Sequence, residues 1–228
     1  MKRIVILALC SLALASASVV MGASGVQGLD RWDLTQEIID ARAANQQALK
    51  AYSWTQRTEV VIKGEVRVLR TELLRYASDG QLQRSPMGEQ PQQQGGRGIR
   101  GRKKASKQQE MKDWAGELAG VIAAYGLGTP GELLDFITSA ALTEQGASLQ
   151  AEGTAVVVPN DHVIIWYDRQ TMLVTGMHVQ TTHAGDAVDL EWGYRVLDSG
   201  PSYIERLGIS VPAQSIEMTI ENFNYMRQ

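Results

Sequence analysis

The sequence predicts an α+β fold, in which a strongly curved antiparallel sheet or unclosed β-barrel has helices packed on its concave face. Segments with helical periodicity and segments with strand periodicity occur in separate blocks, and the strands follow one another through short turns. Separate blocks of this kind are typical of α+β proteins rather than of alternating α/β proteins. About nine strands in one sheet make it wide enough to curl, which favours a partial barrel.

The clearest strand signal is the segment "AVDLEWGYRVL" at 187–197. Its apolar positions alternate strictly and comprise Val188, Leu190, Trp192, Tyr194 and Val196. Charged residues occupy intervening positions, so one face is buried and the other meets water, as in an antiparallel sheet. Similar patterns predict strands at 153–159, 162–168, 171–182, 203–212 and 215–226.

The chain from residue 30 to residue 86 predicts one helix followed by a meander of strands. Asp30 is suited to cap a helix that ends near residue 51. The apolar stripe of this helix comprises Leu34, Ile38, Ala41, Ala44 and Ala48. Two long strands and one shorter strand follow between 52 and 86, with turns at Lys63-Gly64 and at Asp79-Gly80.

Two further helices are predicted before the long run of strands. The first has an apolar stripe of Trp114, Leu118, Val121, Ile122 and Tyr125 and ends at Gly126. The second opens with "TPGE", in which Thr129 and Glu132 form a capping box and Pro130 takes the first helical position.

The first residues indicate an exported protein. Lys2 and Arg3 precede a short apolar run, and 15–17 supplies the small residues of a cleavage site, so 1–17 is interpreted as a signal peptide. The apolar run is too short for a membrane-spanning helix. We expect a flexible mature N-terminus at 18–29 and a single half-barrel domain at 30–228, located in the periplasm or outside a bacterial cell.

Cys10 is the only cysteine and offers an alternative, because a lipoprotein signal also ends in cysteine. Leu9 stands where such a signal needs a small residue, which disfavours lipidation. Cleavage after Ala17 leaves a mature chain without cysteine. Disulfides, thiol catalysis and cysteine-ligated metals are then excluded.

The stretch "PQQQGGRGIRGRKKASKQQ" at 91–109 contains a literal G-x-G-x-x-G in Gly96, Gly98 and Gly101. A dinucleotide site needs a strand before these glycines and a helix after them. Here glutamine and proline precede them, and a charged, polar run follows. A P-loop is also out of register, so both nucleotide interpretations are rejected.

The same stretch predicts a disordered basic Gly/Gln-rich loop at about 88–108, because it lacks the apolar residues of a core. Its basic residues are Arg97, Arg100, Arg102, Lys103, Lys104 and Lys107, whereas the whole chain carries a net charge of -3. Such a cluster suits an anionic membrane surface, anionic glycans or released nucleic acid. A specific nucleic-acid partner conflicts with export, and a solvated linker is the alternative.

The sequence contains few patterns that are typical of catalytic or metal sites. His178 and His183 fall on opposite faces of a strand and so make a poor metal pair, and His162 follows Asp161 in a turn. No G-x-S-x-G, H-E-x-x-H or EF-hand pattern occurs, and no carboxylate pair stands out. These observations favour a protein without enzymatic activity, metal or cofactor.

The apolar face of the sheet is the remaining candidate site. Aromatic residues that could line a ligand cavity there are Trp54, Trp166, Trp192 and Tyr194. A curved sheet with a helical cover can enclose an apolar pocket. The alternative is that these side chains only fill a core.

The order of elements resembles that of the outer-membrane lipoprotein carrier-like (lipoprotein-sorting) superfamily of periplasmic half-barrel proteins. The local likeness is strongest in "IIWYDRQTMLVTGMHVQTTHAGDAVDLEWGYRVL" at 164–197, with its repeated strands and turns. The resemblance implies an unclosed barrel, helices that plug its mouth, and an apolar cavity for acyl chains. It also implies a functional arginine between barrel and lid, for which neither Arg67 nor Arg70 gives a match.

Two functions are therefore carried forward. The first is an exported protein that holds an acyl chain or a lipidated partner in an apolar cavity, without chemistry. The second is a secreted structural or interaction protein with a filled core, whose basic loop contacts anionic surfaces. The two functions differ in one structural feature: the first requires an empty apolar cavity, whereas the second has a filled core.

Export generates the first testable prediction. The mature protein should begin near Ser18 and contain no thiol. N-terminal sequencing and thiol titration of protein purified from the cell envelope measure both properties. A folded cytosolic protein that retains Met1 would contradict the prediction.

Overall fold

The computed structural model describes residues 30–88, 113–198 and 200–228. The strands are β1 (Tyr52–Ile62), β2 (Glu65–Tyr76), β3 (Leu82–Pro86), β4 (Ala141–Gln145), β5 (Ser148–Thr154), β6 (His162–Asp168), β7 (Val174–His183), β8 (Asp186–Val196), β9 (Ser202–Val211) and β10 (Ile216–Arg227). The helices are α1 (Arg31–Leu49), a helix at 113–124 and α3 (Pro130–Ser139), with a short 3-10 turn at Pro212–Gln214.

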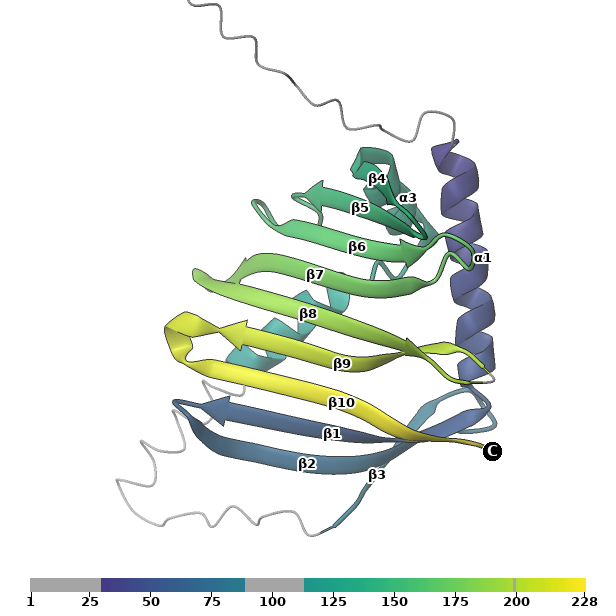
Figure 1. Ribbon diagram of the computed structural model, residues 1–228. Helices are drawn as coiled ribbons and strands as arrows, with labels where there is room; N and C mark the ends of the chain where they lie inside the picture. The colour runs from purple at the N-terminus through teal and green to yellow at the C-terminus, as the bar shows by residue number, and fades with distance from the viewer. Residues whose placement is uncertain (1–29, 89–112, 199) are drawn as a thin grey trace, which may run out of the picture.

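All ten strands form one antiparallel sheet in the order β3-β2-β1-β10-β9-β8-β7-β6-β5-β4 (Figure 1). Consecutive strands pair with each other except β3 and β4, and β1 also pairs with β10, which joins the first hairpin to the last strand. Strands β3 and β4 are the two edges and do not pair with each other, so the barrel stays open. The predicted α+β fold with an unclosed, curved sheet is confirmed.

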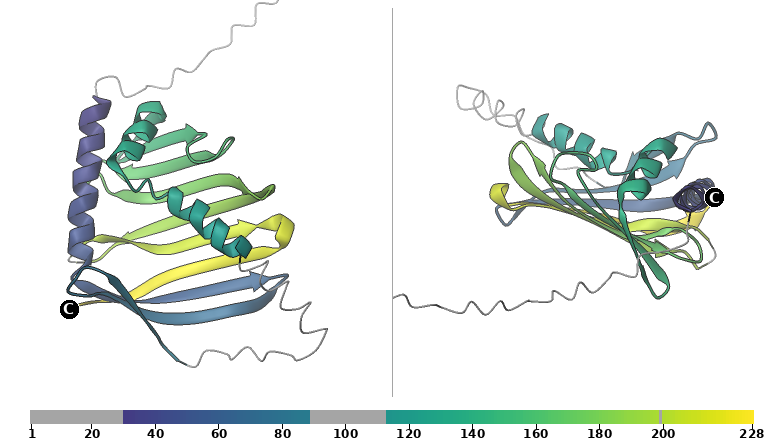
Figure 2. Two further views of the ribbon diagram at one scale, coloured as in Figure 1. Left: turned by 180° about the vertical axis from the view of Figure 1, so that it is seen from behind. Right: turned by 90° about the horizontal axis from the view of Figure 1, so that it is seen from above.

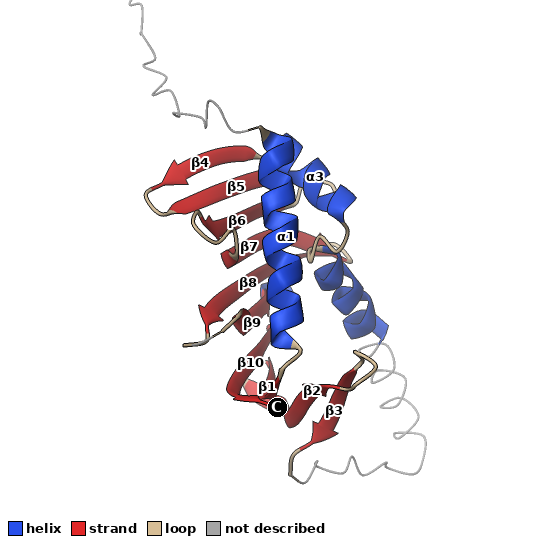
Figure 3. Ribbon diagram, turned by 90° about the vertical axis from the view of Figure 1, so that its right-hand side faces the viewer, coloured by secondary structure: helices blue, strands red, loops and turns tan. Residues whose placement is uncertain are grey.

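The helices cover one face of this sheet (Figure 2). The helix at 113–124 crosses that face, α3 lies over the end that contains β4 and β5, and α1 runs across the ends of the strands (Figures 1 and 3). Helix α3 packs directly on the backbone of β5, because a Cβ at Gly153 would lie 2.9 Å from the ring of Phe136. Glycine is what permits this close approach.

Local signals in the sequence produce the helix ends and turns that they predict. The Asp30 carboxylate accepts a hydrogen bond from the backbone N–H of Trp32 at 2.8 Å and begins α1. Both hydrogen bonds of the capping box between Thr129 and Glu132 are present at the start of α3. The turn between β1 and β2 places Lys63 and Gly64 at positive φ, as a tight hairpin requires.

Two parts of the predicted meander were wrong. The segment 153–159 was predicted as a strand, but strand structure ends at Thr154 and a loop follows. The backbone N–H groups of Val156, Val157 and Val158 donate to the carboxylate of Asp161 rather than to a neighbouring strand. Strands β4 and β5 were missed, because they are short and largely polar and edge-like in composition.

Polar contacts hold α1 in place at both ends. The Arg31 guanidinium donates to the backbone carbonyls of Ile137 and Ala140 at the end of α3. Asn45 makes two reciprocal hydrogen bonds with the backbone of Ser202, of 2.8 and 2.7 Å. Helix α1 is therefore tied to α3 at its first turn and to β9 near its last.

A buried polar cluster ties the helix at 113–124 to the sheet. The Tyr125 hydroxyl, just after that helix, is hydrogen-bonded to the Asp161 carboxylate at 3.0 Å and to the Thr181 hydroxyl at 2.7 Å. Asp161 is 1% exposed. Burial would raise its pKa, but three backbone N–H donors and the Tyr125 hydroxyl hold the pKa below its usual value.

Within the described ranges, no helix is both long enough and apolar enough to cross a membrane.

The Asp161 cluster predicts a pH-dependent contribution to stability. Asp161→Asn should lower the free energy of unfolding by about 2 to 3 kcal/mol at neutral pH, because buried N–H donors lose a charged acceptor. A carboxylate with a depressed folded pKa stabilises fully above its unfolded pKa of about 4, and the stabilisation is lost as pH falls through the folded value.

Urea denaturation of both proteins over a range of pH measures this difference. The gap between wild type and Asp161→Asn should be constant near neutral pH and should shrink below about pH 4. A gap that is independent of pH would show that the ionised carboxylate contributes nothing.

Candidate functional site

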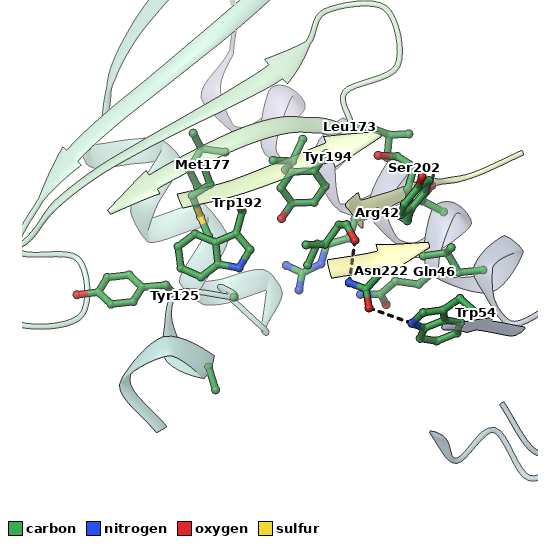
Figure 4. A pocket seen from close by; sticks show the side chains of 18 of the residues that line it. Arg42, Gln46, Trp54, Tyr125, Leu173, Met177, Trp192, Tyr194, Ser202 and Asn222 are labelled. Atoms are coloured by element: carbon green, nitrogen blue, oxygen red, sulfur yellow. Dashed lines mark hydrogen bonds between the residues drawn. The ribbon is translucent and has the colours of Figure 1, made fainter. Parts of the chain in front are cut away.

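A cavity of about 530 Å³ lies between the concave face of the sheet and the three helices (Figure 4). Its volume is within the range of about 300 to 1,000 Å³ that is typical of small-molecule sites. Side chains from all three helices and from eight strands line it, and most of these side chains are apolar. The cavity is therefore a property of the whole domain rather than of one motif.

The floor of the cavity is a row of side chains on adjacent strands. Ile165 on β6 pairs with Met177 on β7, which pairs in turn with Trp192 on β8. All three residues are at least nine-tenths buried and line the cavity. Leu133 of α3 and Ile122 of the helix at 113–124 close the opposite side.

An aromatic cluster forms one end of the cavity. The rings of Trp54 on β1 and Tyr225 on β10 are stacked, with centroids 5.5 Å apart and planes within 7° of parallel. The ring centroids of Tyr203 and Tyr225 are 4.2 Å apart, and those of Tyr76 and Trp54 are 5.8 Å apart. The cluster spans the junction of β1 and β10, so this end exists only because those strands pair.

Asn222 orients the aromatic end. Its side-chain oxygen accepts hydrogen bonds from Trp54 Nε1 at 3.2 Å and from Gln56 Nε2 at 2.9 Å, and its amide nitrogen donates to the Ile204 carbonyl at 2.8 Å (Figure 4). These contacts satisfy its oxygen and one N–H donor. Asn222 therefore fixes the indole ring rather than presenting a free amide to the cavity.

Three of the four aromatic residues predicted to face a cavity do line it, namely Trp54, Trp192 and Tyr194. Trp166 does not. Its neighbours Ile165 and Tyr167 face the cavity, so Trp166 lies on the convex face, where Nε1 donates to Gln150 at 3.2 Å. Trp166 was grouped with the others by residue type, whereas strand alternation places it on the other side.

The cavity-facing stripe of α1 also differs from the predicted one. Leu34 and Ile38 are buried as expected, but Ala44 and Ala48 are exposed. After Ile38, the residues of α1 that line the cavity are Arg42, Asn45, Gln46 and Leu49. The alanine pattern was misleading because the inward face of the second half of the helix is polar.

Arg42 is a cavity-lining cation that the sequence analysis did not identify. Its guanidinium Nη1 donates to the Leu127 carbonyl at 2.7 Å, in the segment between the helix at 113–124 and α3. The rest of its side chain lines the cavity near Tyr194 (Figure 4). A charged residue spaced four positions after the buried Ile38 was the only signal for it in the sequence.

Arg84 is a second cationic group at the wall, but it is compensated. Its Nη1 lies 3.0 Å from Gln56 Oε1 and 3.5 Å from Glu72 Oε2. Arg70 also pairs with Glu72, at 3.3 Å, and Arg67 pairs with Glu65 on the exposed end of β2. Neither Arg67 nor Arg70 lines the cavity.

Two tyrosines place hydroxyls in the cavity close to Arg42. Burial raises the pKa of Tyr194 to about 12, and the nearby positive charge of Arg42 offsets this only in part. Burial also raises the pKa of Tyr167 well above its usual value. Both hydroxyls therefore keep their protons at neutral pH and serve as hydrogen-bond donors.

The histidines do not form a metal site with one another. His162 pairs with Glu152 at 2.7 Å, and His178 pairs with Asp189 at 2.9 Å on the convex face. His183 is buried on the opposite face of β7, as predicted, against the ring of Trp114. In the described ranges, no three histidine or carboxylate side chains are grouped as a metal site would require.

The basic residues proposed for contact with anionic surfaces lie outside the described residues, as does the signal peptide. These residues are Arg97, Arg100, Arg102, Lys103, Lys104 and Lys107. Their role stays a prediction from the sequence.

No protein-family model and no curated protein matches the sequence. The structure is similar to that of a DUF1329 family protein from Desulfovibrio piger, with a TM-score of 0.39 and 9% identity over 87% of this chain and 92% of that chain. It is also similar to the LolA superfamily protein NE2245 from Nitrosomonas europaea, with a TM-score of 0.33 and 8% identity over 82% of this chain and 93% of that chain. At such values the likeness says nothing about what this chain binds.

The floor residue Trp192 tests whether the cavity is open. Trp192→Ala should lower the free energy of unfolding by about 1.5 to 3 kcal/mol, near the transfer value of a buried side chain. A fully packed tryptophan would cost about 3 to 5 kcal/mol, but part of this ring faces the cavity and has no protein contacts to lose.

Leu190→Ala is the matched control on the same strand, because Leu190 is 0% exposed and does not line the cavity. It should cost about 2 to 5 kcal/mol, at least as much as Trp192→Ala despite the smaller side chain. Chemical denaturation of both variants measures the two costs. A clearly larger cost for Trp192→Ala would mean that its ring is packed on all sides.

Proposed function

We propose that this chain is an exported binding protein that holds an acyl chain or a lipidated partner in the cavity, without catalysing a reaction. The observation that carries the proposal is the 530 Å³ space between the sheet and its helices, with a mainly apolar lining. An acyl chain is the common ligand that needs a large apolar surface and few polar contacts.

The wall chemistry supports binding rather than catalysis. The polar side chains that line the cavity include Asn45, Gln56 and Asn222, and each of these is hydrogen-bonded to the protein. Among the described residues, the lining contains no carboxylate, histidine, serine–histidine pair or cysteine that could act as a general base or nucleophile. Such a wall can shield a ligand from water but offers no group to transform it.

The alternative, a structural protein with a filled core, has less support. The core cluster joins the helices to the sheet, and the cavity remains as an open space beside it. Dense packing is the rule in protein interiors, and voids much larger than a water molecule are few. A space of this size is better explained as a site that is kept open.

The proposal includes the compartment. The signal-peptide pattern at 1–17 places the mature chain in the periplasm or outside the cell, as a single half-barrel domain at 30–228. Acyl chains that cross an aqueous compartment need a protein to cover them. The basic loop could bring the domain to an anionic membrane surface where such chains are found.

The direct test is mass spectrometry of the mature protein, purified from its native envelope under non-denaturing conditions. Reproducible lipid adducts that disappear on denaturation are the expected result. Protein that is always free of lipid, and that also takes up no apolar probe, would overturn the proposal.

A substitution that fills the cavity should block uptake of an apolar probe. Val174→Trp places a large ring at a position that lines the cavity. It should weaken binding of the neutral fluorophore N-phenyl-1-naphthylamine by about tenfold or more, since tenfold corresponds to about 1.4 kcal/mol and a few lost methylene contacts supply that amount.

Thr175→Trp is the matched control, because Thr175 is the next residue on β7, is exposed and does not line the cavity. The fluorescence titration of this variant should match that of wild type. Equal loss of binding in both variants would indicate a general disturbance of β7, and no loss in Val174→Trp would place the probe outside the cavity.

A further inference from the structure

Three hydrogen-bond donors of the cavity wall form a candidate polar subsite. These are the guanidinium of Arg42 on α1 and the hydroxyls of Tyr167 on β6 and Tyr194 on β8. All three side chains line the cavity, where Arg42 lies near Tyr194 (Figure 4), and the charge of Arg42 also acts on both tyrosine hydroxyls. They come from three separate elements and meet only in the folded domain.

The three groups are not satisfied by the protein itself. Arginine has five N–H donors, and the one hydrogen bond of Arg42 engages the Leu127 carbonyl. Among the described residues, no hydrogen bond engages the hydroxyl of Tyr167 or Tyr194. Neither oxygen is sealed from the cavity, because the only fully buried side-chain atom without a partner in the described ranges is Nε2 of His183.

The guanidinium of Arg42 also has no salt bridge with a described residue. In the part of the chain that the structure describes, none of the ion pairs within 4.0 Å involves Arg42. The carboxylate of Glu132 interacts electrostatically with Arg42. It also accepts a hydrogen bond from the backbone N–H of Thr129 at 2.9 Å and completes the cap of α3. A partly buried cation without a counter-ion is costly unless a ligand supplies the negative charge.

We propose that Arg42, Tyr167 and Tyr194 form a receptor for an oxyanion, so that the cavity selects an acyl chain with an anionic head group over a neutral one. This proposal rests on the proposed function, since it names the ligand class of the same cavity. A carboxylate or phosphate anion offers only acceptors, the Arg42 guanidinium offers only donors, and each protonated tyrosine hydroxyl has one O–H to donate. The head group sits at Arg42, and the chain extends along the apolar wall.

The oxyanion receptor discriminates between the two ligand classes that the proposed function allows, a free lipid and a lipidated protein. An acyl chain attached through an ester or amide carries no charge where the chain joins its carrier, and so it leaves Arg42 unpaired. A free fatty carboxylate or the phosphate of an acidic lipid neutralises Arg42. The cavity therefore favours a free anionic lipid over a lipidated protein.

The test uses the full mature chain, freed of co-purified lipid, with N-phenyl-1-naphthylamine as a neutral reporter. Dodecanoate, dodecyl phosphate and dodecan-1-ol compete for the reporter at neutral pH, and they share one chain but differ in head group. The two anions should bind more tightly than the alcohol to wild type. Comparison of the two anions tells a carboxylate ligand from a phosphate-bearing one, and tighter binding of either anion supports the receptor.

Arg42→Gln removes the charge and keeps a donor for the Leu127 carbonyl. It should weaken binding of the anions by about tenfold to a hundredfold, as loss of a hydrogen bond to a charged group does, and leave the alcohol unchanged. Arg84→Gln is the matched control, because Arg84 also lines the cavity but is already paired with Glu72. It should leave the order of the three ligands as in wild type.

Tyr194→Phe removes only a hydroxyl and keeps the ring, so it serves if Arg42→Gln disturbs the helices. It should weaken anion binding by about three- to tenfold without an effect on the alcohol. Dodecan-1-ol that binds wild type as tightly as the anions would overturn the proposal and leave the acyl-binding function intact. Equal weakening of all three ligands by Arg42→Gln would also overturn it, whereas no binding of reporter or ligands would reject both.

Discussion

The pairing of β1 with β10 is the contact on which the rest of the structure depends. It joins a hairpin near the start of the domain to the last strand of the chain and unites the ten strands in one sheet. Without it, the sheet would divide into β1–β3 and β4–β10, and the concave wall would end at Tyr225. The stacked rings of Trp54 and Tyr225 lie on the two sides of this junction, so the aromatic end of the cavity is formed by the same contact.

The helices are held at the sheet by apolar packing and by a few polar anchors. Arg31 ties α1 to α3, Asn45 ties α1 to β9, and Tyr125 ties the helix at 113–124 to Asp161 and Thr181. Beside this packing a cavity of about 530 Å³ remains. Side chains that face a void lose dispersion contacts on one side, so an empty cavity lowers stability. A ligand that fills it restores those contacts and stabilises the folded state by mass action.

Arg42 occupies a central position in this arrangement. It reaches from α1 to the Leu127 carbonyl, and Leu127 lies at the junction of two helices with a positive φ of 43°. A non-glycine residue in this region carries backbone strain of about 1 to 3 kcal/mol. The hydrogen bond to Arg42 thus supports a strained junction over the cavity, and the same guanidinium faces the ligand space. One side chain therefore contacts both the cavity and the junction of the two helices.

Much of the fold could be predicted from local patterns. Helix caps at Asp30 and Thr129 and turns at Gly64 and Gly80 depend on residues close in sequence, and the structure confirms them. The strand predicted at 153–159 was wrong beyond Thr154. Its three consecutive valines fit a strand pattern, but their backbone N–H groups donate to the Asp161 carboxylate and not to a neighbouring strand. Whether these valines formed a strand depended on their contact with Asp161, which the strand propensities of the residues do not indicate.

The candidate site shows the same division between what local sequence patterns predict and what tertiary contacts determine. By itself the sequence determined which faces are apolar, because alternation along a strand follows from backbone geometry, and so it identified Trp192 and Tyr194. Only the tertiary structure decided that Trp166 faces away and that Arg42 faces inward. The register of a strand and the rotation of a helix are set by contacts with partners distant in sequence. Whether a polar residue faces water or a cavity depends on those partners, and the sequence alone does not contain their positions.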